Sequence, residues 1–261
     1  MAMRKFLALA LCFGLSGPTA TSAQSVLDAT MAEEGQATPE VSTSELQSIL
    51  KNHGAIVLDA RPPLEYAISH IPSARNVAAK PGVAKHLYVS DVAEVGRMLG
   101  SAKDSNIVLY CNGPFCGKSK RLAAELVEAG YRNVRRYQLG APGWRTFGGA
   151  MQTEPQALTY LRTDKTAVWV DTRGPRDFKA RSVPGARNIP KDELRPGKDQ
   201  GVMKAAKDDG RLPMEDHNTR IIVFGATPDD ARAVADAIAR EAFHNVSFVN
   251  APYARIAGSV R

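Results

Sequence analysis

Apolar and polar residues follow one another in blocks along most of the chain, and these blocks predict alternating strands and helices. The apolar run Ile107–Tyr110 is typical of a short buried strand. A polar turn follows it, and then Leu122, Leu126 and Val127 recur at helical spacing. Strands that alternate with helices in this way favour an α/β fold with a mainly parallel sheet.

The same order of motifs occurs twice in the chain. IVLDAR at 56–61 returns as VWVDTR at 168–173, HIPSARN at 70–76 returns as SVPGARN at 182–188, and NIVLY at 106–110 returns as RIIVF at 220–224. Several matches in one order indicate a duplicated domain. We therefore predict a first domain over residues 41–150 and a second over 155–261, with a linker near 148–155.

The first forty residues have a different character from the two repeats. Arg4 and Lys5 precede an apolar stretch from Phe6 to Leu15, and small residues lead to Ala23. This pattern predicts a signal peptide over residues 1–23, because the apolar stretch is too short to span a membrane. Residues 24–40 are polar and show no period, so we expect a flexible leader there.

Composition narrows the class of protein. The chain is 44% hydrophobic and 23% charged, which is typical of a globular protein, and its formal net charge is +7. A modest positive excess favours small anionic substrates over nucleic acid, since no basic run carries interleaved aromatic residues. Export would place the mature protein in an oxidising compartment, most simply the periplasm, with no membrane attachment after cleavage.

Candidate chemistry is concentrated where the strand ending at Tyr110 meets the following helix. Cys111 lies at this junction, facing the unpaired N–H groups and the positive end of the helix, which lowers a thiol pKa and favours a thiolate nucleophile. Backbone N–H groups of residues 112–119 can stabilise a bound anion, and Lys118 adds positive charge. Ser119 is expected to cap the helix.

The loop also carries a second thiol, Cys116. It can form a disulfide with Cys111, resolve a sulfur adduct on Cys111, or serve as a small apolar filler. A disulfide across so short a loop requires the two Cβ atoms to face each other, which the sequence leaves open.

Taken together, these motifs resemble the rhodanese family. Asp-x-Arg after a strand, then HIPSARN or SVPGARN, then a strand ending in cysteine before a helix, is similar to that family over nearly all of the chain from Val41 onward. The resemblance implies two tandem domains, each with a mainly parallel five-stranded sheet flanked by helices. It also implies sulfur transfer through a persulfide on Cys111, without a cofactor or metal.

The resemblance further implies the partners and the substrate-contacting residues. The donor would be thiosulfate or a similar small anion, and the acceptor cyanide or a thiol. Apart from the resemblance, a disulfide between Cys111 and Cys116 in an exported protein would require a periplasmic reductant before sulfur transfer. The arginine after the first strand can approach the substrate in the family. The expected substrate-binding residues are Arg61, Asn112, Gly113, Phe115, Gly117, Lys118 and Ser119.

The second repeat lacks the nucleophile. Gly225 stands opposite Cys111 when the halves are aligned on their strands, and no base accompanies the nearby Thr227. Because Asp171 and Arg173 persist in this half, the Asp-x-Arg motif has a structural role in both halves. We expect the second domain to be inactive and to shape one wall of the site.

Two other classes of function compete with sulfur transfer. One is a redox-responsive or thiol-based binding protein that uses Cys111 and Cys116 without turnover. Two thiols alone do not complete a zinc site, which needs four ligands. The other is a phosphatase or arsenate reductase of related fold, which would require an arginine where Cys116 and Gly117 stand.

Overall fold

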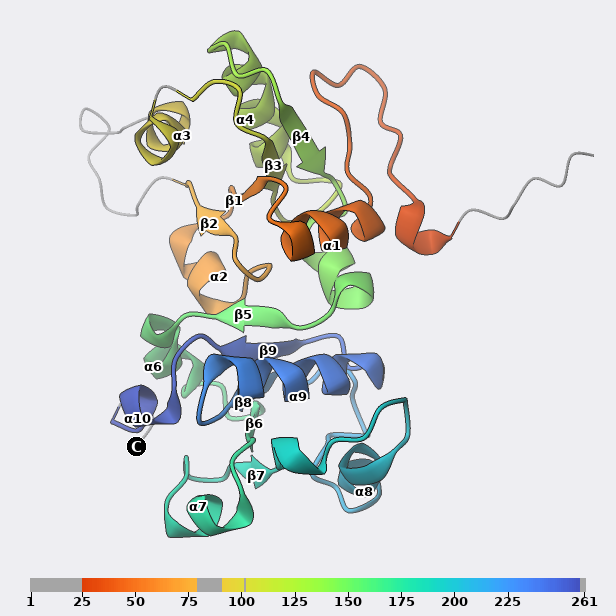
Figure 1. The fold of residues 1–261 in the computed structure, drawn as a ribbon, viewed down its shortest axis with the longest axis vertical. Coiled ribbons are helices and arrows are strands. Elements are labelled where there is room, and N and C mark those ends of the chain that lie inside the picture. Colours follow the sequence, from red (N-terminus) through yellow and green to blue (C-terminus); the bar gives the residue numbers. More distant parts are fainter. Residues whose placement is uncertain (1–24, 79–90, 101, 259–261) are drawn as a thin grey trace, which may run out of the picture.

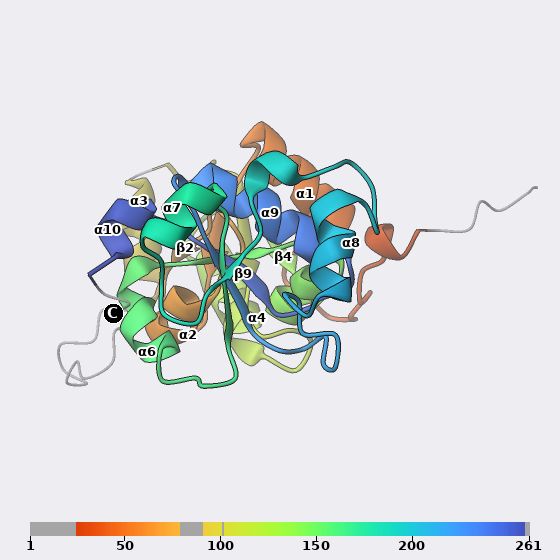
Figure 2. The same ribbon diagram turned by 90° about the horizontal axis from the view of Figure 1, so that it is seen from below.

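The structure is a computed structural model that describes residues 25–78, 91–100 and 102–258. The predicted signal peptide, residues 1–23, lies outside the described residues. In Figure 1 the two repeats form two domains, one above the other, with the second domain in teal and blue. Seen from below in Figure 2, α7 (Pro175–Ala180) and α8 (Gly201–Asp208) lie nearest the viewer, so they form the end farthest from the first domain.

The first domain alternates strands and helices as the sequence pattern predicts. Ser42 and Glu45 form a reciprocal capping box at the start of the first helix, which satisfies backbone N–H groups that a helix leaves unpaired. The elements in chain order are α1 (Thr43–Asn52), β1 (Ile56–Asp59), α2 (Pro63–Ile68), β2 (Arg75–Asn76), α3 (Asp91–Leu99), β3 (Ile107–Tyr110), α4 (Gly117–Glu128), β4 (Val134–Tyr137) and α5 (Gly140–Gly143), followed by a π-helical turn, Trp144–Gly148.

The second domain repeats this order with small changes. Its elements are β5 (Met151–Thr153), α6 (Leu158–Leu161), β6 (Val168–Asp171), α7, β7 (Arg187–Asn188), α8, β8 (Ile221–Phe224), α9 (Pro228–Arg240), β9 (Val246–Val249) and α10 (Tyr253–Ile256). Short 3-10 turns lie at Val26–Asp28, Pro155–Ala157 and Lys191–Glu193. The strands β6, β8 and β9 are fully buried, as apolar runs covered on both faces must be.

Both sheets are parallel and share one register. The first has the order β2-β1-β3-β4 and the second β5-β9-β8-β6-β7. Asp59 pairs with Tyr110 in the first sheet, and Asp171 pairs with Phe224 in the second. This equivalence confirms that the strand before Cys111 and the strand before Gly225 are counterparts.

The number of strands differs from the expectation of five in each domain. Among the described residues, the second sheet has five strands and the first has four, and an isolated parallel bridge from Glu40 to Arg136 lies beyond β4. Two backbone hydrogen bonds support that bridge: the Val41 N–H donates to the Arg136 carbonyl at 2.7 Å, and the Arg136 N–H donates to the Pro39 carbonyl at 2.9 Å. The chain around residues 39–41 is therefore a rudimentary fifth strand.

The segment expected to be a flexible leader lies against the first domain. The Glu40 carboxylate accepts the N–H groups of Met31, Ala32 and Glu33. Glu33 in turn pairs with Lys120 of α4. Charged and amide side chains thus fix this polar stretch, which has no apolar period to predict its packing.

The linker between the repeats also contains structure. β5 pairs with β9 of the second sheet, and Gln152 within it forms an antiparallel bridge to His70 of the first domain. In Figure 1, β5 runs between α2 and β9, at the boundary of the two domains.

Candidate active site

Cys111 lies at the carboxyl end of β3, among the carboxyl ends of the neighbouring strands. Cys111 is 1% exposed and packs in the core of the first domain. Its carbonyl accepts the Ala141 N–H at 2.9 Å. Gly140 approaches so closely that a Cβ there would lie 2.3 Å from the same carbonyl, and its φ is +61°. The turn after β4 therefore fixes the backbone of Cys111.

Cys116 returns to Cys111 through a tight turn. The Cys116 N–H donates to the Gly113 carbonyl at 3.0 Å, and Gly113 has a φ of +96°, which favours glycine. The two sulfur atoms form a disulfide across a Cα–Cα distance of 6.3 Å. Of the three alternatives for Cys116, the structure has the disulfide.

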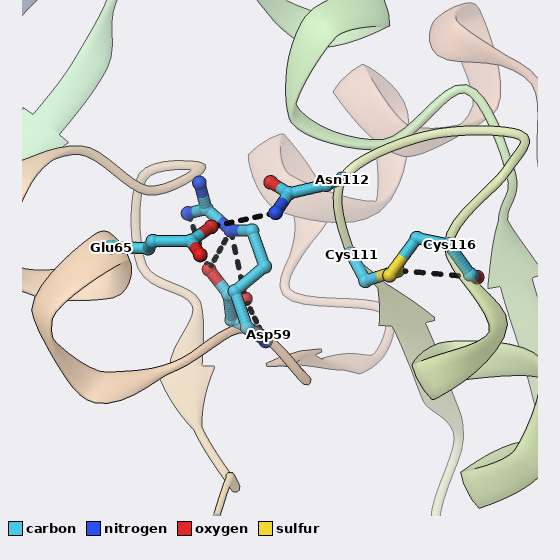
Figure 3. Close-up of a disulfide and its surroundings, with 6 residues drawn as sticks. Asp59, Glu65, Cys111, Asn112 and Cys116 are labelled. Atoms are coloured by element: carbon cyan, nitrogen blue, oxygen red, sulfur yellow. Dashed lines mark hydrogen bonds and ion pairs between the residues drawn. A yellow bond between two sulfur atoms is a disulfide. The ribbon is translucent and has the colours of Figure 1, made fainter. Parts of the chain in front are cut away.

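The disulfide joins one buried and one accessible residue. Cys111 is buried, whereas Cys116 is half-buried and stands at the N-cap of α4 without a side-chain capping bond. The Cys111 Sγ lies 3.4 Å from the Cys116 carbonyl oxygen, an acceptor for the thiol in its reduced form. Figure 3 shows both cysteines on one side of the site and Asp59 and Glu65 on the other.

The predicted loop residues divide by exposure. Asn112, Phe115, Gly117 and Lys118 are exposed, and Phe115 has its whole side chain in solvent at 103% relative exposure. Gly113 is buried under the turn after β4. An aromatic side chain without packing partners at the loop tip is available to contact a larger molecule.

Ser119 does not cap the helix. α4 begins at Gly117 with Cys116 as its N-cap, so Ser119 lies within the first turn and is 3% exposed. The expectation failed because the polar residues Gly117 and Lys118 already belong to the helix, whereas the apolar period begins only at Leu122.

Arg61 is held by the first domain itself. Its guanidinium pairs with Asp59 at 2.6 Å and donates to the Ser69 carbonyl at 2.6 Å, and the side chain is 3% exposed. Arg173 repeats both contacts, with Asp171 and the Arg181 carbonyl. This agreement between the halves supports the structural role of the motif.

Tyr110 completes the buried cluster around Asp59. Its hydroxyl donates to the Asp59 carboxylate at 2.5 Å and accepts the Ile71 N–H at 3.0 Å. Burial, followed by the negative charge of Asp59, raises the pKa of Tyr110 well above its usual value. In the second domain Phe224 replaces this tyrosine, and the Ser182 hydroxyl donates to Asp171 at 2.7 Å instead.

Two residues near the site were not predicted from the sequence. Glu65 of α2 accepts the Asn112 amide at 2.6 Å and so ties the loop to the opposite side of the site. Arg145 donates to the Ser69 hydroxyl at 2.5 Å, and burial, with repulsion from Arg61 and Arg220, lowers its pKa to about 10. Both could have been found from the repeat, since the counterpart of Glu65 is the acidic Asp177 and the counterpart of Arg145 is Arg255.

In the second domain, Thr172 as it stands occupies the space that a side chain at the position of Cys111 would need. A Cβ built on Gly225 would lie 2.2 Å from Oγ1 of Thr172. Thr172 is the counterpart of Ala60, because each donates its N–H to the last residue of the central strand, Phe224 or Tyr110. The helix after Gly225 also begins sooner, at Pro228, so the loop is shorter than its counterpart in the first domain.

Within residues 25–78, 91–100 and 102–258, no group of three or more His, Cys, Asp or Glu side chains could hold a metal ion. No helix in the same ranges is long and apolar enough to cross a membrane.

Comparison with known proteins adds the family. The model of the rhodanese-like domain matches twice, over residues 42–146 and 154–256. The adenylyltransferase and sulfurtransferase UBA4 of Candida albicans is 32% identical over 105 residues, which are 40% of this chain and 23% of that protein. The chain thus spans less than a quarter of the length of this curated relative.

Some solved structures are similar to the chain at low identity. Thiosulfate sulfurtransferase from Pseudomonas aeruginosa is 18% identical, with 82% of this chain and 43% of that chain covered and a TM-score of 0.35. The BH2092 protein from Bacillus halodurans is 24% identical over 44% of this chain and 77% of its own, with a TM-score of 0.36. Wild-type EanB is 17% identical, with 82% of this chain and 58% of that chain covered and a TM-score of 0.34.

Proposed function

The chain belongs to the rhodanese-like domain family, and from this premise we propose that it is a sulfurtransferase with Cys111 as its nucleophile. The observation that carries the proposal is the difference between the halves. In the first domain, β3 is followed by Cys111 and then by a helix. In the second domain, the equivalent strand β8 is followed by Gly225, and Thr172 occupies the space that a side chain there would need. The chemistry therefore belongs to the first domain, and the second domain is inactive.

The reaction begins when the Cys111 thiolate attacks the outer sulfur of a donor such as thiosulfate. A bond forms between the cysteine sulfur and the sulfane sulfur, the bond to sulfite breaks, and a persulfide remains on the enzyme. Cyanide or a thiol then accepts the sulfane sulfur. The positive end of α4 and the exposed Lys118 favour an anionic donor next to the loop.

Only the reduced protein can enter this cycle, because the disulfide occupies the sulfur of Cys111. A thiol reductant must therefore act before the first turnover. We place the protein in the periplasm on the pattern of residues 1–23, where such a reductant would have to be supplied.

The test uses Cys116→Ser, which keeps Cys111 and cannot form the disulfide. The reduced variant is mixed with thiosulfate, the excess donor is removed, and the intact mass is measured. We expect the gain of one sulfur atom, located on Cys111 by peptide mapping. Cys111→Ser is the matched control and should gain none. If the Cys116→Ser protein takes up no sulfur from thiosulfate or from a polysulfide, the transferase proposal fails.

A second function, a redox-responsive thiol protein without turnover, is favoured by one observation, the disulfide between Cys111 and Cys116. It would give reversible disulfide formation with oxidants and no sulfur uptake by either single-cysteine variant. The same mass measurement therefore separates the two functions.

A further inference from the structure

The position of Cys116 determines which sulfur atom it can attack. Its Sγ is bonded to the Sγ of Cys111 itself. In a persulfide on Cys111, that Sγ is the inner sulfur and the transferred sulfur is the outer one. Attack by Cys116 on the inner sulfur would release the outer sulfur as sulfide.

The loop holds the two residues ready for this attack. The turn from Gly113 to Cys116 closes through a backbone hydrogen bond of 3.0 Å. The Asn112 amide donates a hydrogen bond to the Glu65 carboxylate, and Gly113 lies beneath the turn that contains Leu139 and Pro142. A thiol held next to its target reacts at an effective concentration far above that of a free thiol.

Cys116 is also well placed to act as a thiolate. It is the N-cap of α4, a helix of 12 residues whose first turn contains no acidic side chain. The Cys116 side chain makes no capping hydrogen bond, so the N–H groups of the first turn and the helix dipole can favour a negative charge on its sulfur.

The exposure of the two cysteines indicates which sulfur atom an external reductant attacks. Cys111 is 1% exposed and Cys116 is half-buried at the surface of the loop. A thiol that reduces the disulfide must reach one sulfur along the S–S axis, and Cys116 is the accessible one. Attack there leaves Cys111 as the released thiolate, ready for another donor.

On the basis of the proposed function, we propose that this protein reduces sulfane sulfur to sulfide, with Cys116 as the resolving thiol and a dithiol as the electron source. First, the Cys111 thiolate takes the outer sulfur of thiosulfate and sulfite leaves. Second, the Cys116 sulfur forms the disulfide with the Cys111 sulfur, the bond to the outer sulfur breaks, and the outer sulfur leaves as hydrosulfide with the proton that the Cys116 thiol gives up. Third, a dithiol reduces the disulfide and is itself oxidised to a cyclic disulfide. The two electrons of the dithiol end on the sulfide.

A single-turnover experiment without reductant tests this inference. Reduced wild-type protein is freed of reductant under nitrogen and mixed with thiosulfate, and sulfide and intact mass are measured. We expect about one sulfide per chain and conversion of the protein to the disulfide form. Cys116→Ser and Cys116→Ala should retain the persulfide and release no sulfide, and Cys111→Ser should do neither.

The outcomes separate the inference from the function on which it rests. Persulfide retained by the wild type, with no sulfide, would overturn the resolving role while leaving sulfur transfer in place. Absence of sulfur uptake by both Cys116 variants would overturn both. The urea midpoints of the two variants show whether they are folded, so that a lost signal is not mistaken for lost chemistry.

A steady-state comparison provides a second readout. With dithiothreitol and thiosulfate, we expect the wild type to produce sulfide roughly tenfold faster than Cys116→Ser, since the variant must rely on free thiol. With cyanide in place of the dithiol, Cys116→Ser should form thiocyanate over many turnovers, whereas the wild type should stop after oxidation to the disulfide. Equal sulfide rates for the two proteins would contradict the proposal.

Discussion

Thr172 fills the space that a side chain on Gly225 would need. Its Oγ1 lies 2.2 Å from the position of an added Cβ, and it has no hydrogen-bond partner within the described structure. In the first domain the equivalent pair is Ala60 and Cys111, both buried in one core. The two halves therefore differ by a coupled exchange of a small and a larger residue, and not by the loss of a cysteine alone.

Restoring the cysteine should therefore require two changes. We expect Gly225→Cys alone to destabilise the protein by about 1–3 kcal/mol, because the core around Thr172 is already filled. Thr172→Ala combined with Gly225→Cys should recover most of that loss. Urea unfolding of the single and double variants measures the effect, with Thr172→Ala alone as the control. Equal stability of the two Gly225→Cys proteins would show that Thr172 is not the obstacle.

The hydroxyl of Tyr110 should contribute to stability. Tyr110→Phe leaves a buried oxygen of Asp59 and the Ile71 N–H without this partner, so we expect a loss of about 1–3 kcal/mol in the free energy of unfolding. Tyr131→Phe is the matched control, because the Tyr131 hydroxyl is buried without a partner among the described residues. It should be neutral or slightly stabilising. Similar losses for both variants would contradict the assignment.

His70 should make stability depend on pH. It stacks on Tyr66 and lies 3.5 Å from Glu154, and its burial lowers its pKa from the usual 6.5 despite Glu154 and Asp59, with Arg61 adding to the decrease. His70 is therefore protonated more readily in the unfolded chain than in the folded protein. Its contribution to the free energy of unfolding is fully present above pH 6.5 and is lost as the pH falls below 6.5. The loss is limited to about 1.4 kcal/mol for each pH unit.

Urea unfolding at several pH values checks this dependence. Between about pH 7.5 and 5.5, His70→Gln should lose less stability than the wild type. His53→Asn should behave as the wild type, because His53 is exposed and its left-handed backbone, with φ of 52°, suits asparagine. A His70→Gln slope equal to that of the wild type would exclude His70 as the titrating group.

Glu40 should hold the segment before the first domain in place. Glu40→Ala removes the acceptor for the N–H groups of residues 31–33, so we expect faster amide exchange there and earlier proteolysis of residues 25–38. Glu34→Ala, in which an exposed carboxylate is removed, should change neither. Hydrogen exchange with mass spectrometry measures the effect. Unchanged exchange in Glu40→Ala would mean that Glu33 and Gln36 suffice.

Much of the fold follows from local sequence, for physical reasons. Short apolar runs bounded by turn residues, such as Ile107–Tyr110, favour buried strands, and the repeated motifs indicate which strands correspond. The match of Cys111 with Gly225 was confirmed by the register of both sheets.

What the sequence did not predict depends on contacts between distant residues. β5 has only three residues and no period, and it is a strand because β9 lies beside it. Arg145 reaches Ser69 across 76 positions of the chain. The pairing of Cys111 with Cys116 required the turn at Gly113, whose φ cannot be read from its neighbours. These features arise from tertiary packing, so local sequence patterns do not predict them.

The position of β5 has a consequence for the energetics of the whole chain. This strand completes the second sheet, while Gln152 exchanges two backbone hydrogen bonds with His70, and Thr153 donates its hydroxyl to the Ile68 carbonyl at 2.8 Å. If the second domain were produced without β5, β9 would become an open edge of its sheet. If the first domain were produced without β5, the Ile68–His70 segment would lose its hydrogen-bond partners. The two repeats are therefore not thermodynamically independent, and they should unfold in one cooperative transition.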